Sequence, residues 1–269
     1  MKDKKIDKYI KEQSTKLTNS LISRRQFVMS VLATGVTLPI ALTLADKAVA
    51  ASANKGGHFR WGNGAADTTD TLDPATYQSS FMQAVAWSYQ NCLTVVDSDH
   101  KVIPELAESI ESDDAQTWVY NLHKGVEFHN GQTMTADDVV ANYQYHMNPD
   151  TASAAGGLLS QIDTISADGP NRVIFKLKAA NADWPAITTD YHIMIKPTKD
   201  GVVDAQSTIG TGPYIMDEFN PGVGAKFGKR NPNYFKGDAY AHFDSIEVIG
   251  INDPATRQAA LLNGEIDWM

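Results

Sequence analysis

The segment ELAESIESDDAQTWVYNLHKGVEFHNGQTMTADDVV, residues 105–140, holds the strongest local structure signals of the chain. Apolar and polar residues alternate from Thr117 to Leu122, which is typical of a β-strand with one buried face. Val126 and Phe128 then predict a partner strand. Asn130-Gly131 supplies the two positive-φ positions of a hairpin turn. We therefore expect two neighbouring strands in the middle of this segment.

The two ends of the segment carry helix signals. Leu106, Ala107 and Ile110 share one face of a helix, which predicts a docked helix over residues 104–111. Thr135 stands where an N-cap residue belongs, and Asp138 follows three residues later. This spacing is a capping box with Asp in place of the usual Glu. It predicts an amphipathic helix that starts at residue 136 and ends at residue 147.

The rest of the chain reads as alternating short strands and helices. Single strands are expected at residues 58–62, 93–97, 214–219 and 243–249 and from residue 265, and two strands within residues 163–177. Helices are expected at residues 81–93, 183–189 and 255–262. Mixed strands and helices of this kind predict an α/β fold.

Several short motifs occur in an order that resembles the signature of family 5 extracytoplasmic solute-binding proteins. These are the dipeptide, oligopeptide and nickel-type receptors of ABC importers. The matching motifs are Pro104-x-Leu106-Ala107-Glu108, Trp118, Lys124-Gly125-Val126-x-Phe128-His129-x-Gly131, Thr135-Ala136-x-Asp138-Val139, Gly210-Thr211-Gly212-Pro213-Tyr214 and Arg230-Asn231-Pro232-Asn233-Tyr234-Phe235. The resemblance implies a type II periplasmic-binding-protein-like clamshell, with mixed sheets flanked by helices.

The resemblance also implies a domain layout. Residues 51–94 and 196–269 would form the first lobe, and residues 95–195 a smaller inserted domain. Gly264-Glu265-Ile266-Asp267 lies near the middle of family members, so the chain is expected to be a truncated N-terminal half whose second lobe is absent.

Residues 1–50 have the three parts of an export signal: a basic start, an uncharged run over residues 27–45, and the small-residue site Ala48-Val49-Ala50. The pair Arg24-Arg25 favours the twin-arginine type, with cleavage after Ala50. An ordinary secretory signal and a retained membrane anchor are the two other interpretations. The protein is expected to be periplasmic or otherwise extracytoplasmic.

Charge and cysteine content exclude several classes. The first 50 residues hold nine of the 23 Lys and Arg but four of the 32 Asp and Glu, so residues 51–269 carry a net charge of −14. An acidic surface repels phosphate backbones, so we expect no nucleic-acid partner. The single cysteine, Cys92, excludes an internal disulfide and is expected to be a buried thiol.

Catalytic and metal-binding patterns are not visible. The pairs Asp113-Asp114 and Asp137-Asp138 are adjacent in sequence, so neither pair shares a face as a general acid and base would. The seven histidines are scattered without metal-ligand spacing, and no nucleophile elbow occurs. We therefore expect no catalytic residues, no metal and no cofactor.

The resemblance places a cleft-lining segment after Leu72-Asp73-Pro74. Its residues would be Tyr77, Gln78, Ser79, Ser80 and Phe81, whose backbone would hold a ligand. The other interpretation is that Tyr77 and Phe81 are only hydrophobic anchors.

No helix follows Gly210-x-Gly212, so this pair is not expected to hold a phosphate. The backbone freedom of the two glycines instead suits a tight chain crossing. His129 is expected to pack within its turn, and Arg230 to form an ion pair.

The resemblance thus implies a monomeric receptor that captures a small solute and delivers it to an ABC permease and its ATPase. Peptides are the favoured ligand class, while nickel complexes, opines and oligosaccharides stay open. Two other hypotheses are an exported hydrolase, such as a peptidase or glycosidase, and a peptide-sensing or chaperone-like protein with the same fold.

Overall fold

The computed structural model describes residues 2–18, 21–50, 55–237 and 240–269. The chain divides into two compact units. One contains residues 1–56 and 238–242, and the other contains residues 57–237 and 243–269.

In its described residues, the first unit contains three helices, α1 (Lys2–Thr18), α2 (Arg24–Leu32) and α3 (Leu38–Ala50). Ser23 caps α2, because its Oγ accepts the Gln26 N–H at 3.2 Å while the Gln26 side chain accepts the Ser23 N–H at 2.8 Å. The helices share a small apolar core of Leu17, Phe27, Val28, Val31, Ala41, Ala45 and Ala48.

The predicted signal residues lie on these helices. Arg24 and Arg25 are exposed in the first turn of α2. Ala50 ends α3, and the bond expected to be cleaved joins it to Ala51, which lies outside the described residues. None of the helices in the described part of the chain is both long and apolar enough to cross a membrane.

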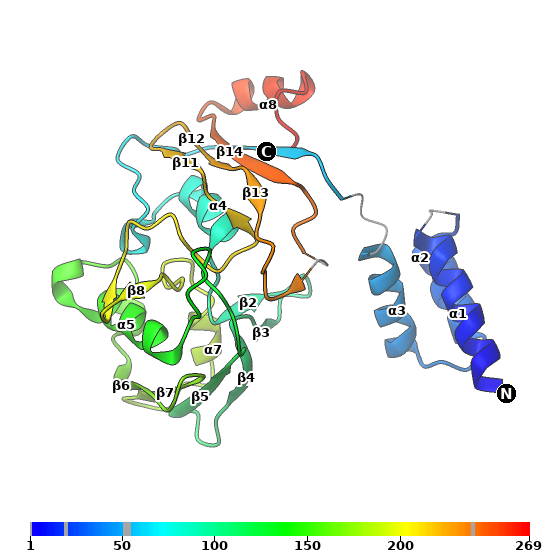
Figure 1. The fold of residues 1–269 in the computed structure, drawn as a ribbon, viewed down its shortest axis with the longest axis horizontal. Helices are drawn as coiled ribbons and strands as arrows, with labels where there is room; N and C mark the ends of the chain where they lie inside the picture. The colour runs from blue at the N-terminus through cyan, green and yellow to red at the C-terminus, as the bar shows by residue number, and fades with distance from the viewer. Residues whose placement is uncertain (1, 19–20, 51–54, 238–239) are drawn as a thin grey trace. The chain divides into compact units, whose positions relative to one another are not determined.

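The second unit contains two four-stranded sheets and three two-stranded ladders, with helices beside them (Figure 1). Its helices are α4 (Ser80–Tyr89), α5 (Ala136–Met147), α6 (Gly156–Leu159), α7 (Trp184–Ile187) and α8 (Pro254–Leu262), with 3₁₀ turns at Pro74–Thr76 and Pro149–Thr151. Its strands are β1 (His58–Asn63), β2 (Thr94–Val96), β3 (Val102–Pro104), β4 (Ala107–Glu111), β5 (Thr117–Leu122), β6 (Ile162–Ala167), β7 (Arg172–Leu177), β8 (Thr198–Lys199), β9 (Val202–Val203), β10 (Tyr214–Ile215), β11 (Glu218–Asn220), β12 (Gly224–Phe227), β13 (Lys229–Arg230) and β14 (Ser245–Gly250).

The two larger sheets differ in topology. The sheet β4-β5-β7-β6 is antiparallel throughout. In the sheet β1-β14-β12-β11, β1 runs parallel to β14, with His58 opposite Ser245 and Asn63 opposite Gly250. The two sheets lie toward opposite ends of this unit, and α8 lies at the same end as β14 (Figure 1).

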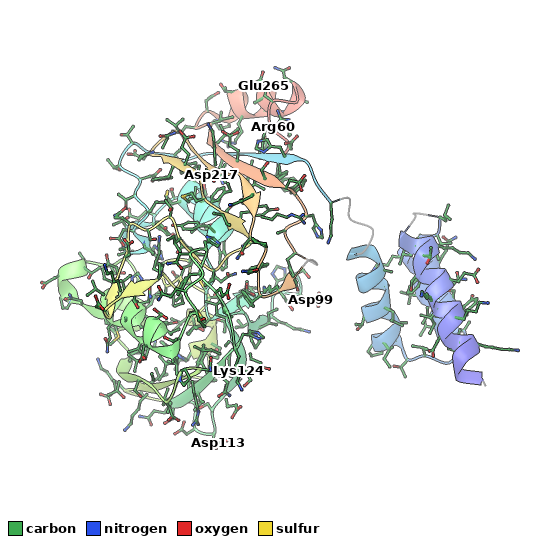
Figure 2. The ribbon with its side chains drawn as sticks, viewed as in Figure 1. Arg60, Asp99, Asp113, Lys124, Asp217 and Glu265 are labelled. Carbon is green, nitrogen blue, oxygen red and sulfur yellow. The ribbon has the colours of Figure 1, made fainter. Side chains whose placement is uncertain are left out.

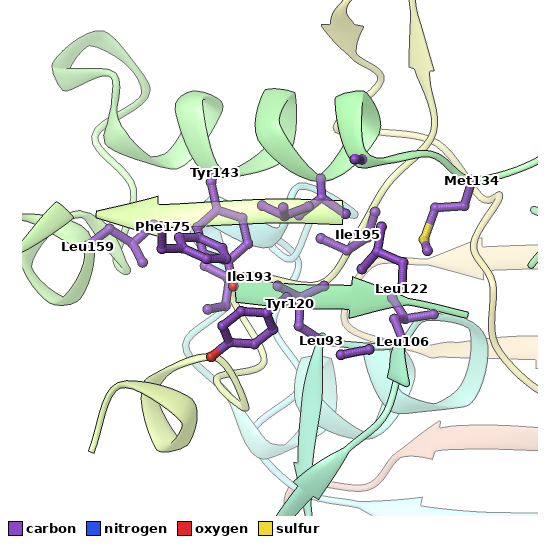
Figure 3. Packing of buried hydrophobic residues seen from close by; sticks show 14 of the residues in the cluster. Leu93, Leu106, Tyr120, Leu122, Met134, Tyr143, Leu159, Phe175, Ile193 and Ile195 are labelled. Carbon is purple, nitrogen blue, oxygen red and sulfur yellow. The ribbon is translucent and has the colours of Figure 1, made fainter. Parts of the chain in front are cut away.

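The helix α5 covers the antiparallel sheet and forms as its sequence predicts. Asp138 Oδ2 accepts hydrogen bonds from the Thr135 N–H at 2.8 Å and from the Thr135 hydroxyl at 2.9 Å, so the capping box is present. Tyr143 on this helix packs edge-on against Phe175 of β7, with ring centroids 4.9 Å apart. The apolar cluster around these rings, shown in Figure 3, is the main core of the unit.

The predicted helix over residues 104–111 is wrong, because this stretch forms the end of β3 and all of β4. Ala107 lies opposite Leu122 and Glu111 opposite Val119, with a shift in register between Ala107 and Ser109. Because of the shift, Ala107 and Ile110, three residues apart, lie opposite Leu122 and Tyr120, which share one face of β5. A β-bulge thus produced the spacing that resembles a helix.

The predicted partner strand at Val126 and Phe128 is also wrong. Only an isolated bridge joins Glu127 to Thr133, and β5 pairs instead with β4 and β7. Of the expected turn pair, Gly131 has a positive φ of 83°, and Asn130 has no positive φ. The turn is closed by the Gly131 N–H, which donates to the Phe128 carbonyl at 2.8 Å.

Other boundaries differ by a few residues for local reasons. The helix expected at residues 81–93 ends at Tyr89. The Tyr89 carbonyl accepts a hydrogen bond from the Gly212 N–H at 2.9 Å, so it does not accept one from a residue of the same helix. The strand expected at residues 214–219 is split into β10 and β11, which pair with different partners. The strand expected from residue 265 is only a parallel bridge between Trp61 and Trp268.

The side chains of the predicted turn at Asp113-Asp114 are exposed at the tip between β4 and β5 (Figure 2). Asp114 Oδ1 accepts the backbone N–H groups of Gln116 at 2.9 Å and Thr117 at 2.7 Å. These hydrogen bonds lower the pKa of Asp114, so its carboxylate acts as a turn cap.

Candidate ligand-binding site

An open pocket of about 440 Å³ lies where the parallel strands β1 and β14 end. Ligands of α/β proteins commonly bind at the carboxyl ends of parallel strands. The N-termini of α4 and α8 contribute residues to the same pocket. Its principal side chains are Trp61, Asn63, Ser80, Asn252, Arg257 and Trp268.

Two glycines allow the pocket wall to form. A Cβ on Gly62 would lie 2.5 Å from Cδ1 of Ile266, and a Cβ on Gly64 would lie 2.9 Å from Nη1 of Arg257. The absence of these side chains lets Arg257 extend along the chain that follows β1, where it donates to the Ile251 carbonyl at 2.5 Å.

Polar contacts fix the rim of the pocket. The Ser80 hydroxyl donates to Oδ1 of Asn63 at 2.9 Å, and Nδ2 of Asn63 donates to the Ser80 carbonyl at 3.3 Å. These contacts join the end of β1 to the start of α4. Asn252 makes a similar pair of bonds with the backbone of Ala66, both at 2.9 Å.

The segment after the last helix lies beside β1. The Gly62 N–H donates to the Trp268 carbonyl at 2.8 Å. Arg60 donates two side-chain hydrogen bonds to the carboxylate of Asp267, at 3.0 and 3.1 Å, which lower the pKa of that carboxyl. Trp268 is thereby held at the pocket with 61% of its surface exposed.

The five residues predicted for the ligand segment have different environments. The side chains of Tyr77 and Phe81 are buried, whereas Gln78 and Ser80 are exposed. Ser79 caps α4 by accepting the Met82 N–H at 3.0 Å. Of the five, Ser80 lines the pocket. The two aromatic rings therefore serve as anchors of the segment.

Sequence reasoning missed most of the pocket. Trp61 and Asn63 were not predicted, but the end of the predicted first strand is a signal that could have located them, since pocket residues gather at strand ends. Arg257 and Trp268 reach it only because β1 pairs with β14, which is more than 180 residues away in sequence.

The pocket chemistry suits binding of a small organic molecule. Of the described residues that line it, Arg257 alone carries a side-chain charge, and the indoles of Trp61 and Trp268 offer apolar faces. A guanidinium is a good partner for a carboxylate. Across the part of the chain that the structure describes, no group of three or more His, Cys, Asp or Glu residues could hold a metal ion.

The expected chain crossing is confirmed at the C-terminal end of α4. A Cβ on Gly210 or Gly212 would lie 2.0 or 2.3 Å from backbone atoms of Tyr89. His129 packs within the same crossing. Its Nδ1 accepts the Gly210 N–H at 3.3 Å and its Nε2 donates to the Gly212 carbonyl at 3.0 Å, while burial lowers the pKa of its ring. This histidine is structural.

Two further sequence expectations are confirmed. Arg230 lies 3.8 Å from the carboxylate of Asp244, as an ion pair. The thiol of Cys92 is buried, which raises its pKa well above the usual value, and it donates to the Asp190 carbonyl at 3.3 Å. A protonated, buried thiol is not a nucleophile.

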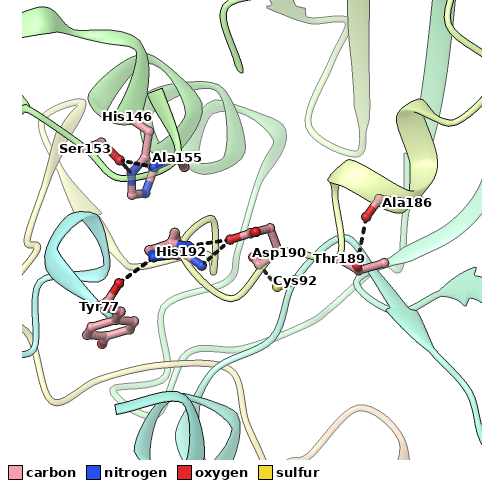
Figure 4. Close-up of polar contacts among 9 residues, drawn as sticks. All are labelled: Tyr77, Cys92, His146, Ser153, Ala155, Ala186, Thr189, Asp190 and His192. Carbon is pink, nitrogen blue, oxygen red and sulfur yellow. Dashed lines mark hydrogen bonds and ion pairs between the residues drawn. The ribbon is translucent and has the colours of Figure 1, made fainter. Parts of the chain in front are cut away.

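A group of buried and half-buried polar side chains lies near Tyr77 of the ligand segment (Figure 4). Asp190 contacts His192, whereas Ser153 contacts a different histidine, His146. A hydrolytic triad needs one histidine between the carboxylate and the hydroxyl. These contacts therefore do not activate Ser153 as a nucleophile.

Comparisons with known proteins identify the family of the chain. Residues 101–269 match the model of the bacterial extracellular solute-binding proteins, family 5. The glutathione-binding protein GsiB of Pectobacterium atrosepticum is 33% identical over 211 residues, which are 75% of this chain and 40% of that protein. The oligopeptide-binding protein AppA of Bacillus subtilis is 29% identical over 187 residues, 65% of this chain and 34% of AppA.

The likeness extends to solved structures. Haemophilus influenzae OppA, in complex with the peptide RPPGFSPFR, superposes with a TM-score of 0.71 and 23% identity over 79% of this chain and 45% of OppA. This match confirms the predicted α/β binding-protein fold. The chain spans well under half the length of the curated relatives that it matches. With the family model matching 169 of its residues, the chain belongs to family 5 of the bacterial extracellular solute-binding proteins.

Proposed function

We propose that this protein is the extracytoplasmic substrate-binding component of an ABC importer and that it captures a peptide or a similar small solute. It would deliver that solute to a membrane permease and its ATPase. The observation that carries the proposal is the open pocket at the ends of β1 and β14, with a guanidinium and two indoles on its walls. Family membership and the peptide and glutathione named for AppA and GsiB support it.

The proposal includes a domain layout and an absence of catalysis. Residues 51–94 and 196–269 would form one lobe, with residues 95–195 inserted. Ligand would stabilise a closed state through contacts that the open state lacks. Residues 77–81 would present backbone groups to it, and the protein would act as a monomer without metal, cofactor or catalytic residues.

A peptide would place its carboxylate at Arg257 and its apolar atoms against Trp61 and Trp268. Hydrogen bonds to charged groups are stronger than those between neutral groups, so the charge of Arg257 should contribute clearly to affinity. Amidation of the peptide's carboxyl group should remove that contribution.

Calorimetric titration of the full chain with glutathione and with trialanine tests this function. Arg257→Gln should weaken trialanine binding about tenfold and leave binding of trialanine amide unchanged. Arg172→Gln is the matched control, because Arg172 is exposed on β7 and pairs with Asp168. The proposal would be overturned if neither probe bound at millimolar concentration. Hydrolysis of either probe would overturn it as well.

We further propose that residues 1–50 are a twin-arginine export signal cleaved after Ala50. Fusion of these residues to a reporter, compared with the same fusion carrying both Arg24→Lys and Arg25→Lys, tests the assignment. Export should be lost when both arginines are replaced, because the twin-arginine route requires the pair. Undiminished export would show an ordinary secretory signal.

A further inference from the structure

A second open pocket, of about 560 Å³, lies between two walls in the same unit. One wall is the turn of residues 127–131. The other wall is the ladder of β10 and β13, together with residues 231–233. Of the described residues that line this second pocket, none also lines the pocket at the ends of β1 and β14. A concave volume of this size is typical of small-molecule sites.

Three side-chain hydrogen bonds hold the walls of the second pocket in place. One joins the two walls directly, because Nδ2 of Asn233 donates to Oε2 of Glu127 at 2.9 Å. The other two end at one atom: Nε2 of His129 and Nδ2 of Asn231 both donate to the Gly212 carbonyl, at 3.0 and 3.1 Å. The second pocket is therefore formed without a ligand, so a ligand does not have to order its walls.

The strand register decides which cation faces the second pocket. Lys229 lies opposite Ile215, and Arg230 lies opposite Tyr214. Opposite residues of an antiparallel pair share one face, and neighbours along a strand alternate between the faces. Tyr214 is buried and Arg230 pairs with Asp244, whereas Ile215 lines the pocket. The side chain of Lys229 therefore faces the second pocket, and that of Arg230 points away from it.

Two opposite charges line the second pocket without pairing with each other. Lys229 is exposed, and it forms no ion pair with any residue that the structure describes. Glu127 is half-buried, and its Oε2 is used by Asn233. Its Oε1 accepts no hydrogen bond from the described part of the chain. The pocket thus offers a free ammonium group and a free carboxylate oxygen.

A ligand that carries both charges fits these groups. Its carboxylate would accept hydrogen bonds from Lys229, its ammonium group would donate to Glu127, and its apolar atoms would contact Ile215. A purely anionic ligand is disfavoured by the net negative charge of residues 51–269, and a purely cationic one by Lys229. We propose that the second pocket binds a small zwitterion of the α-amino-acid class. This inference goes beyond the proposed function and does not depend on it.

Calorimetric titration of the full chain with L-alanine at low salt tests the inference. N-Acetyl-alanine lacks the ammonium group and alanine amide lacks the carboxylate. Each should bind about fivefold more weakly, the effect of one ion pair that is open to solvent. Lys229→Gln should weaken binding of L-alanine by about the same factor and leave binding of alanine amide unchanged. Lys226→Gln is the matched control, because Lys226 is exposed on β12 and pairs with Glu218.

Glu127→Gln tests the other charge. A glutamine oxygen still accepts the Asn233 side-chain N–H, so the walls stay joined. This variant should bind L-alanine more weakly and N-acetyl-alanine as the wild type does. Nuclear magnetic resonance of the wild-type chain locates the site without any variant: L-alanine should shift the backbone amide signal of Gly131 and leave that of Ser80 unchanged.

Three results would overturn the inference. They are a failure of L-alanine to bind at millimolar concentration, equal binding by the wild type and Lys229→Gln, and a shift at Ser80 with none at Gly131. None of them bears on the receptor function, which trialanine and Arg257→Gln test separately. Conversely, unchanged trialanine binding in Arg257→Gln would count against the ligand contact proposed at β1 and β14 and leave the second pocket untouched.

Discussion

The second unit is stabilised in two different ways in neighbouring regions. The region around β4, β5, β7 and α5 is an apolar core, in which Tyr120, Tyr143 and Trp184 surround the ring of Phe175. The region that contacts residues 77–81 encloses ionisable groups instead, among them the half-buried His192 and the fully buried Lys196. Apolar side chains do not ionise, so their burial stabilises the fold equally at every pH, whereas a buried ionisable group makes stability depend on pH.

The difference matches the expected roles of the two regions. The apolar core holds a sheet that contributes no residue to the pocket among those described. The polar layer supports the segment that ends at Ser80, on the pocket rim. Polar contacts are directional, so they can orient a backbone group in a way that apolar packing cannot.

The substitution expected to destabilise the apolar region most is Phe175→Ala. Its side chain is fully buried and contacts three other rings, so the cavity should lower the free energy of unfolding by up to about 5 kcal/mol. The loss should be the same at about pH 6 and about pH 8.5, as measured by urea unfolding. Phe219→Ala, at a half-buried site on β11, should cost much less. A loss that varies with pH would contradict the contrast between the regions.

The sequence predicted the apolar region better than the polar one, since its signals are local. The alternation of Thr117–Leu122 and the capping box at Thr135 and Asp138 are short-range patterns, and both elements form as predicted. The error at residues 104–111 has a local cause as well. A bulge at Ala107 placed apolar residues at a helical spacing within a strand.

The polar region and the pocket depend on contacts that no local pattern records. Tyr77 and His192 are 115 residues apart, and β1 meets β14 from the far end of the chain. The family resemblance located residues 77–81, but the exposure of Gln78 and Ser80 and the burial of Tyr77 and Phe81 required the fold. Arg257 and Trp268 were missed for the same reason.

Lys196 gives the sharpest test of the polar region. Its side chain is fully buried, and Nζ donates to the Tyr89 hydroxyl at 2.8 Å and to the Ser207 carbonyl at 2.6 Å. Burial lowers the pKa of Lys196 to about 7, and the negative charges of Asp204 and Asp73 only partly oppose this shift. The folded chain therefore binds the lysine proton less tightly than the unfolded chain does.

The sign of the pH dependence follows from this difference. Between about pH 7 and pH 10 the unfolded chain keeps a proton on Lys196 that the folded chain has released, so stability rises with pH, by about 4 kcal/mol over three pH units. Lys196→Met should remove this rise when urea unfolding is compared across that range. Lys199→Met, at an exposed site on β8, should keep it. An unchanged rise in the Lys196→Met chain would assign the pH dependence to another group and would remove the distinction between the two regions, because Lys196 would then be no more than a packed side chain.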